Sequence, residues 1–212
     1  VTNAGRLREI DSFKRARFVI QDPGSFEIIS KLDVADGSKW WDACAGAGGK
    51  SIALLYHTKK SSIELLATDV RERMQKNYSE RLMAHGFSNF EFAFADLQKS
   101  TFRNEVYDGV IVDAPCSGSG TWHNSPESKV NFSKRNLDDF VELQKRILVN
   151  ASKNVKKSGQ LLYITCSVFA DENEQVLASL PSDLGLESLE SGYVDGYMYG
   201  ADTFYYNLFT KN

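Results

Sequence analysis

Two cysteines stand where a thiol could take part in a reaction. Cys116 follows the apolar run 110–112 in the segment Val-Ile-Val-Asp-Ala-Pro-Cys-Ser-Gly, and Cys166 ends a second apolar run in Leu-Leu-Tyr-Ile-Thr-Cys-Ser. Taken alone, a cysteine after a strand is most often a small buried apolar residue, and Cys44 keeps that interpretation. Two thiols beside a ligand cleft favour covalent catalysis, because a thiolate can attack a carbon atom that is otherwise inert.

A glycine-rich turn follows a third apolar run, in Trp-Trp-Asp-Ala-Cys-Ala-Gly-Ala-Gly-Gly-Lys-Ser at 40–51. Glycines let a ligand approach the backbone, and a helix that starts there attracts negative charge. A phosphate-binding P-loop would need glycine where Cys44 stands, so that match is partial and is the weaker interpretation. A dinucleotide fingerprint would need a third glycine at Ser51. The stronger interpretation is a nucleoside-bearing cofactor without a pyrophosphate.

Four acids end successive apolar runs or follow them: Asp42, Asp69, Asp96 and Asp113. The carboxyl ends of strands line the ligand crevice of an open α/β sheet, so these four side chains are expected to ring one cleft. Asp69 stands 19 residues after Lys50, where a carboxylate can accept both ribose hydroxyls. A single aspartate in such a place is most often a helix N-cap, but four on one edge favour a site.

The elements that must position these residues alternate between apolar runs and helical periodicities, which indicates a largely parallel sheet with crossover helices. Strands are predicted at 39–44, 63–69, 90–95, 107–113 and 159–166, with an antiparallel closing strand at 203–210. Met74, Tyr78 and Leu82 mark one helix. A second carries the stripe Leu137, Phe140, Val141, Ile147, Leu148, Ala151 and Val155, and a third covers 171–180. The long polar stretch 114–136 is predicted to be functional.

Length and composition fit one globular domain: 212 residues, 42% hydrophobic and 25% charged. No apolar run approaches the roughly 20 residues of a membrane span, and no signal segment opens the chain, so we expect a soluble, cytoplasmic protein. The cysteines are far apart with no Cys-x-x-Cys pair, which argues against a metal site or disulfides and for a reducing compartment.

The net charge of −3 is unevenly distributed. Residues 1–20 carry five basic and two acidic groups, and residues 129–166 carry eight basic and three acidic groups. Residues 167–212 carry one basic group and eight acidic groups. Solvated helix faces with an acidic tail explain this pattern, and so do basic segments that contact nucleic acid.

Together these motifs resemble the RNA cytosine-5 methyltransferases of the Sun family, which includes bacterial small-subunit ribosomal RNA enzymes and eukaryotic nucleolar and tRNA enzymes. The resemblance runs from residue 21 to the end of the chain. Its motifs are Asp113-Ala-Pro-Cys116-Ser-Gly118-x-Gly120, then Thr165-Cys166-Ser167 followed by Glu172-Asn173-Glu174, together with Asp42-x-Cys44-Ala45 and Gly48-Gly49-Lys50.

The resemblance implies a Rossmann-like class I S-adenosylmethionine-dependent methyltransferase, with a mostly parallel seven-stranded sheet and helices on both faces. It implies a single catalytic domain over 1–212 with an N-terminal helical lead-in at 1–36, and we expect an RNA-binding region before Val1. The implied activity is methyl transfer from S-adenosylmethionine to carbon 5 of cytosine in ribosomal RNA or tRNA, without a metal or a membrane.

Roles for individual residues follow from the same resemblance. Cys166 is the nucleophile that adds to carbon 6, Cys116 assists release, and Asp113 lies beside the pyrimidine and the methyl donor. Asp69 holds the ribose of the donor and Asp96 its adenine. The backbone of the glycine turn holds the methionine end, through Cys44, Ala45, Gly46, Ala47, Gly48, Gly49 and Lys50.

Two departures from the family pattern matter. Ala47 replaces a proline, which should change only the stiffness of the turn. His123-Asn124 replaces an arginine pair and should weaken RNA contacts, since neither residue is a permanent cation. Two other functions stay open. A small-molecule methyltransferase would explain the turn and Asp69 but does not need both thiols, and an inactive RNA-binding scaffold would have no reason to keep them.

Overall fold

A computed structural model describes residues 21–58, 62–196 and 200–212. Seven strands form one sheet in the order β3-β2-β1-β4-β5-β7-β6. The first five are parallel to their neighbours, and β7 runs antiparallel between β5 and β6. The strands are β1 Lys39–Asp42, β2 Glu64–Asp69, β3 Phe90–Phe94, β4 Tyr107–Asp113, β5 Val155–Thr165, β6 Leu186–Val194 and β7 Phe204–Lys211.

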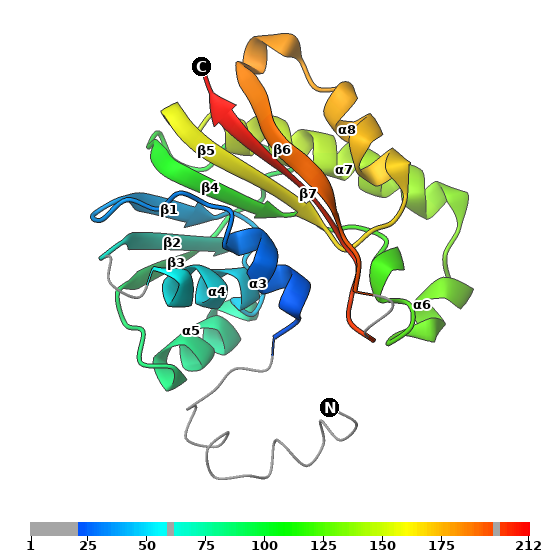
Figure 1. Cartoon of the computed structure of the whole chain (residues 1–212), viewed down its shortest axis with the longest axis horizontal. Helices are drawn as coiled ribbons and strands as arrows, with labels where there is room; N and C mark the ends of the chain where they lie inside the picture. The colour runs from blue at the N-terminus through cyan, green and yellow to red at the C-terminus, as the bar shows by residue number, and fades with distance from the viewer. Residues whose placement is uncertain (1–20, 59–61, 197–199) are drawn as a thin grey trace.

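Helices cover both faces of the sheet (Figure 1). On one face lie α3 Pro23–Ile29, α4 Gly49–His57 and α5 Met74–Ala84; on the other lie α7 Lys134–Ser152 and α8 Glu174–Ala178. The short helix α6 Pro126–Val130 and the 3-10 turns Ser119–Thr121, Ala170–Glu172 and Ser182–Leu184 belong to connections. None of the helices in the described part of the chain is long and apolar enough to cross a membrane.

Two neighbouring tryptophans show how the central strand joins the two cores. Trp40 and Trp41 of β1 are both buried, and because successive strand residues point to opposite faces, each enters a different core. Trp40 packs with residues of α3 and α4, whereas Trp41 packs with residues of α7. A Cβ atom on Gly109 of β4 would lie 2.2 Å from the ring of Trp40, so only glycine fits beside it.

The expected α/β architecture is confirmed, with an antiparallel closing strand at β7. Two details differ. Val155, expected on the long helix, is instead the first residue of β5, where it pairs with Tyr107. The helix expected at 171–180 is a 3-10 turn followed by the five residues of α8. The basic segment 1–20, and with it much of the expected lead-in, lies outside the described residues; within 21–36 the chain forms α3.

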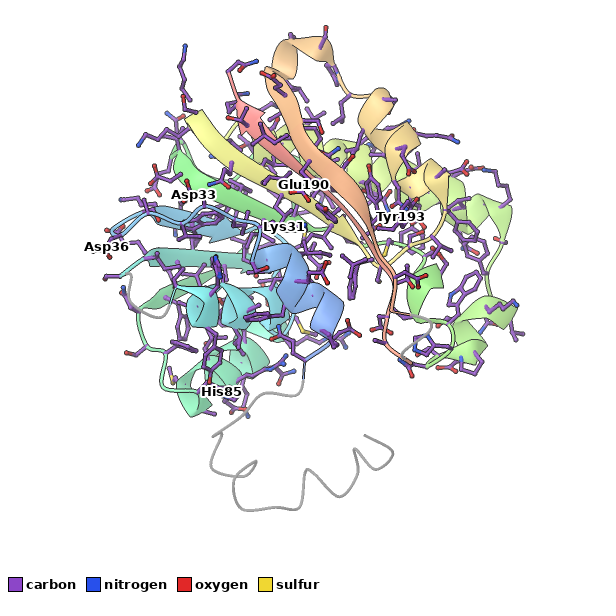
Figure 2. All side chains as sticks on the ribbon, viewed as in Figure 1. Lys31, Asp33, Asp36, His85, Glu190 and Tyr193 are labelled. Atoms are coloured by element: carbon purple, nitrogen blue, oxygen red, sulfur yellow. The ribbon has the colours of Figure 1, made fainter. Side chains whose placement is uncertain are left out.

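The seventh strand, β6, carries no sequence signal that distinguishes it. None of its nine residues is buried, since it is an edge strand bonded only to β7. Its antiparallel pairing with β7 positions it, and Lys31, after α3, adds an ion pair with Glu190 of β6 at 2.7 Å (Figure 2). Tyr206 also donates to Glu190 at 2.7 Å. Tertiary contacts, rather than local hydrophobic alternation, define this edge.

Asp42 does not join a ring of acids, contrary to the expectation from the sequence. Its side chain is fully buried beneath the glycine turn, where Oδ2 accepts a hydrogen bond from Ser51 at 2.6 Å. Tyr78 in turn donates to Ser51 at 2.9 Å, and Oδ1 of Asp42 has no partner among the described residues. Asp42 therefore faces the interior, because the strand it ends is covered by α4 and α5.

This burial predicts a pH-dependent stability. Burial raises the pKa of Asp42 to about 7, against the opposing hydrogen bond from Ser51. An unfolded aspartate has a pKa near 4, so between about pH 4 and 7 the folded state keeps a proton that the unfolded state has lost. The free energy of unfolding should fall across this window, by up to about 4 kcal/mol, and stay level above it.

Urea denaturation of the wild type and of Asp42→Asn, followed by tryptophan fluorescence from pH 4.5 to 8, measures this effect. We expect the decline in the wild type and a much smaller one in the variant. Asp108→Asn is the control, because Asp108 forms an ion pair with Lys156 at 2.9 Å and its lowered pKa places its own contribution below pH 4. Equal slopes in the wild type and Asp42→Asn would show that Asp42 is ionised in the folded protein.

Candidate active site

A cleft of about 620 Å³ opens at the carboxyl edge of the sheet. It is bounded by the glycine turn after β1, by the ends of β2 and β3, and by the loops after β4 and β5. Of the residues predicted to form the site, the cleft brings together Cys44, Ala45, Gly46, Ala47, Gly49, Asp69, Asp96, Asp113, Cys116 and Cys166. Gly48 and Lys50 are close to this group but do not line the cleft.

The glycine turn depends on two left-handed residues. Gly46 has φ 52° and Gly48 has φ 83°, a region that side chains with a Cβ atom rarely adopt. A Cβ on Gly48 would also lie 2.8 Å from Leu82 of α5, so this glycine lets α4 begin close to α5. The role of Gly48 is thus to shape the turn, while Gly46 and Gly49 present backbone to the cleft.

Asp69 is held firmly at the end of β2. Its Oδ2 accepts from Gly46 N–H at 2.9 Å, and its Oδ1 accepts from the backbone and side chain of Arg71, each at 2.9 Å. Burial works against ionisation, but the hydrogen bonds and charge of Arg71 and the bond from Gly46 prevail and lower the pKa of Asp69. Asp69 is therefore an ionised acceptor at the cleft wall, and both of its carboxylate oxygens accept hydrogen bonds from the side chain of Arg71.

Asp96 and Asp113 complete the acidic lining. Asp96 accepts from Gln98 N–H at 3.2 Å and pairs with exposed Lys99 at 2.9 Å. Asp113 ends β4 and pairs at 2.9 Å with Lys50, which reaches it from the first turn of α4. Burial opposes the charge of Lys50, yet the carboxylate of Asp113 outweighs it and raises the pKa of this lysine. Lys50 is thus a buried cation beside the end of β4.

The two cysteines meet, as their positions after neighbouring strands predict. The sulfur atoms of Cys116 and Cys166 lie 3.4 Å apart, and both thiols are free. The hydrogen bond with Cys166, together with burial, raises the pKa of Cys116 well above its usual value. Burial and the contact with Cys166 both favour the protonated form of Cys116, and the contact allows either sulfur atom to be the donor.

Cys44 lies in the cleft wall but differs from the other two cysteines. Burial, with the nearby carboxylates of Asp42 and Asp113, strongly raises the pKa of Cys44. The thiol stays protonated at neutral pH, as expected for a cysteine that serves as a small apolar residue.

The loop after Cys116 is fastened to two other segments at Gly120. Gly120 N–H donates to Cys166 O at 2.9 Å, and Gly120 O accepts from Thr203 N–H at 3.1 Å. A Cβ atom here would lie 2.1 Å from Thr203 O. The last glycine of the motif is therefore required because three backbones converge.

The stretch 114–136 contains the 3-10 turn Ser119–Thr121 and α6, and it carries His123 and Asn124. Asn124 donates to Asp202 at 3.1 Å, and His123 lies 3.8 Å from the same carboxylate. Both side chains are thus directed to Asp202 within the chain. Beside them, the rings of Trp122, Phe132 and Phe169 form an aromatic cluster with centroids 5.3–5.8 Å apart.

The basic excess in 129–166 does not gather at the cleft. Lys156 and Lys157 stand near the start of β5, at the edge of the sheet opposite the two cysteines. Lys134 pairs with Asp138 and Asp171. Lys129 and Arg135 form no ion pair within the part of the chain that the structure describes.

Two buried polar residues lie beneath the cysteine loops without a role predicted from the sequence. Glu172 and Gln144 are fully buried and hydrogen-bonded to each other at 3.0 Å. Glu172 belongs to the Glu-Asn-Glu motif, and Gln144 is a polar exception on the apolar stripe of α7, which is a signal of a buried hydrogen bond.

The lining of the cleft decides what it can hold. Asp69, Asp96 and Asp113 would repel a pyrophosphate, but they suit hydroxyl groups, amino groups and a positively charged sulfonium. The residues present therefore fit S-adenosylmethionine, and the volume suits a nucleoside with an amino acid attached. Among the described residues, no cluster of histidine, cysteine or acidic side chains could hold a metal ion.

Comparison with solved structures shows the fold. The crystal structure of PH0851 superposes with a TM-score of 0.86 over 96% of this chain and 49% of that chain, at 26% identity. The N-methyltransferase NodS from Bradyrhizobium japonicum WM9 superposes with a TM-score of 0.56 over 96% and 98% of the two chains, at 15% identity. The sheet order with antiparallel β7 is that of class I S-adenosylmethionine-dependent methyltransferases.

Comparison of sequences shows the family. The ribosomal RNA small subunit methyltransferase B of Photorhabdus laumondii subsp. laumondii is 30% identical over 95% of this chain and 49% of its own length. The probable enzyme of that name from Bacillus subtilis is 34% identical over 82% of this chain and 39% of its own length. The chain thus spans about half, or less, of the length of these relatives.

A family model described as 16S rRNA methyltransferase RsmB/F matches residues 29–194. Since that match contains the whole cleft, the chain belongs to the RsmB/F family of S-adenosylmethionine-dependent RNA cytosine-5 methyltransferases.

Proposed function

We propose that this chain transfers a methyl group from S-adenosylmethionine to carbon 5 of cytosine in RNA, and that the described residues form one catalytic domain. The observation that carries the proposal is the 3.4 Å contact between Cys116 and Cys166 at one end of a nucleoside-sized cleft. The names of the bacterial relatives favour small-subunit ribosomal RNA over tRNA, and hence a cytoplasmic site of action.

Residues of the cleft have separate tasks in holding the donor. Asp69 accepts hydrogen bonds from the ribose hydroxyls, which requires Arg71 to release part of its contact. Asp96 faces the adenine, and the backbone of the glycine turn faces the methionine end. When bound, S-adenosylmethionine supplies an electrophilic methyl group.

Cys166 acts first in this mechanism. Its thiolate adds to carbon 6 of cytosine, a carbon–sulfur bond forms, and the electron pair of the 5,6 double bond moves to carbon 5. Carbon 5 then bonds to the methyl group, and the electron pair of the broken methyl–sulfur bond would stay with the donor, which would leave as S-adenosylhomocysteine. Lys50 supports this step, because its buried cation interacts with negative charge on Cys166 as well as on Asp113.

Cys116 acts last, and its contact with Cys166 explains the order. The proton at carbon 5 must leave and the carbon–sulfur bond must break before the double bond is restored. In the free protein, Cys166 is the largest cause of the raised pKa of Cys116. Once Cys166 is a thioether it no longer carries charge, so that cause is removed, the pKa of Cys116 falls and Cys116 can release its proton to solvent. As a thiolate, Cys116 then takes the carbon 5 proton, the electron pair of that carbon–hydrogen bond restores the 5,6 double bond, and Cys166 leaves as a thiolate.

Binding of the donor is the first test. Hydrogen bonds to a charged group contribute about 1.5–3 kcal/mol, so Asp69→Ala should weaken S-adenosylmethionine binding by about 10- to 150-fold in calorimetry. Asp108→Ala is the matched control at the opposite edge of the sheet and should bind the donor as the wild type does. Unchanged affinity in Asp69→Ala would remove this residue from the ribose contact.

The order of the two thiols is the second test. Incubated with S-adenosylmethionine and a small-subunit ribosomal RNA transcript, Cys116→Ala should accumulate a covalent protein–RNA complex that survives a denaturing gel. Cys166→Ala should form none, because blocking the first step leaves no adduct to trap. The double variant is the control for non-specific crosslinking, and a tRNA transcript in parallel distinguishes the two RNA classes.

The opposite pattern, with an adduct only in Cys166→Ala, would reverse the assignment of the two cysteines. If the double variant, which lacks both thiols, still transfers the methyl group, the result would favour a small-molecule methyltransferase. Donor binding without methylation of any RNA would favour the inactive RNA-binding scaffold.

A further inference from the structure

A carboxylate shielded from solvent lies beneath the loops that carry the two cysteines. Glu172 ends the 3-10 turn between β5 and α8, and none of its surface is exposed. Removing a carboxylate from water is unfavourable unless several hydrogen bonds replace the lost hydration. Neither step of methyl transfer uses this group directly, so its burial calls for another reason.

The hydrogen bonds of Glu172 connect the two thiols through the residues that follow them. Its Oε2 accepts from the hydroxyl of Ser117 and from that of Ser167, each at 2.5 Å. Its Oε1 accepts from Ser117 N–H at 2.8 Å. Ser117 directly follows Cys116, and Ser167 directly follows Cys166. One carboxylate therefore holds the chain next to each sulfur atom.

Two further residues hold Glu172 itself in place. Gln144 of α7 donates to Glu172 Oε1 at 3.0 Å and to Pro115 O at 2.9 Å, on the other side of Cys116. Tyr163 of β5 donates to the backbone carbonyl of Glu172 at 2.7 Å. The side-chain oxygen of Gln144 is buried without a partner among the described residues. The two hydrogen bonds that the amide group of Gln144 donates offset the unfavourable burial of its oxygen.

Asn173 completes the support around Cys166. Its Oδ1 accepts from Thr165 Oγ1 at 2.6 Å, and its Nδ2 donates to Ser167 O at 2.9 Å. The same amide donates to the hydroxyl of Tyr193, which Figure 2 shows at the end of β6 nearest these loops. Both neighbours of Cys166 in the chain are thus bonded to one buried side chain.

The charge of Glu172 also favours one distribution of protons in the thiol pair. After Cys166 and burial, the carboxylate of Glu172 contributes to the raised pKa of Cys116. A negative group on the Cys116 side opposes a second negative charge there. It therefore favours the state in which Cys116 keeps its proton and Cys166 is free to react.

We propose that Glu172 is a positioning residue, which sets the spacing of Cys116 and Cys166 through the hydroxyls of Ser117 and Ser167. The proposal rests on the proposed function for what the thiols do to RNA. The spacing itself, and the difference in reactivity between the two thiols, belong to the free protein and are measurable without RNA.

The experiment compares the full chain as wild type, as Glu172→Gln and as Glu174→Gln. Glu174 belongs to the same motif, is exposed and, among the described residues, accepts a hydrogen bond from Tyr193 alone, so it is the matched control. Each protein is treated with iodoacetamide at pH 7, and the modification of each cysteine is followed over time by peptide mass spectrometry. Wild type and Glu174→Gln should be modified faster at Cys166 than at Cys116.

In Glu172→Gln, one carboxylate oxygen becomes an NH2 group that must face either the two hydroxyls or the N–H groups of Ser117 and Gln144, so the loops lose one of the two acceptor atoms and the negative charge. We expect the preference for Cys166 to fall by about tenfold or more, as for the loss of one charged hydrogen bond. Binding of S-adenosylmethionine should be unchanged, because Glu172 does not line the cleft. A lower melting temperature with an unchanged labelling ratio would make Glu172 merely structural and overturn the proposal.

A second variant covers the case in which Glu172→Gln does not fold. Ser117→Ala combined with Ser167→Ala removes both hydroxyl donors but keeps the carboxylate and its bond from Ser117 N–H. The proposal expects the same fall in preference there, and an unchanged ratio would overturn it. If the labelling depends on Glu172 while the wild type forms no RNA adduct, the proposed function fails and the positioning role stands.

Discussion

The register of two parallel strands places the reactive groups of this protein. β4 and β5 pair from Gly109 with Gln160 to Asp113 with Ile164, so both strands end at the same edge of the sheet. Cys116 and Cys166 follow those ends and bring their sulfur atoms within 3.4 Å of each other. A slip of one residue would turn the side chains of one strand to the opposite face and separate the pair. The cleft, the acidic lining and the supporting hydrogen bonds all depend on this alignment.

Buried polar groups are concentrated at that edge. Lys50, Asp69 and Glu172 are all buried, and each has a partner of matching character: Asp113, Arg71 and the two serines. Buried charges stabilise a fold less than apolar residues of the same size would. Their presence around the cleft, beside two clusters of apolar core residues, indicates that this region is organised for chemistry at some expense of stability.

One departure from the expected family pattern lies in the loop after Cys116. His123 and Asn124 stand where the family pattern has two arginines, and both side chains are directed to Asp202 instead of into the cleft. The contact between the two thiols does not involve these two side chains, and backbone bonds of Gly120 join the loop to Cys166 and Thr203. The loop therefore keeps the position of the Cys116 thiol, but it carries fewer cations than the family pattern predicts.

Sequence alone determined the class of fold and most of the site, because both leave local signals. Apolar runs that alternate with helical stripes indicated the sheet, and the residues at strand ends identified Asp69, Asp96, Asp113, Cys116 and Cys166. Only the tertiary structure decided which of these side chains face the cleft. Asp42 obeys the same strand-end rule but is covered by two helices, and β6 has no buried face to reveal it. The bonds from Glu172 to Ser117, 55 residues earlier in the chain, form only after the two strands have paired. A one-dimensional pattern records periodicity and spacing, whereas such contacts arise from packing between segments that are distant in the sequence.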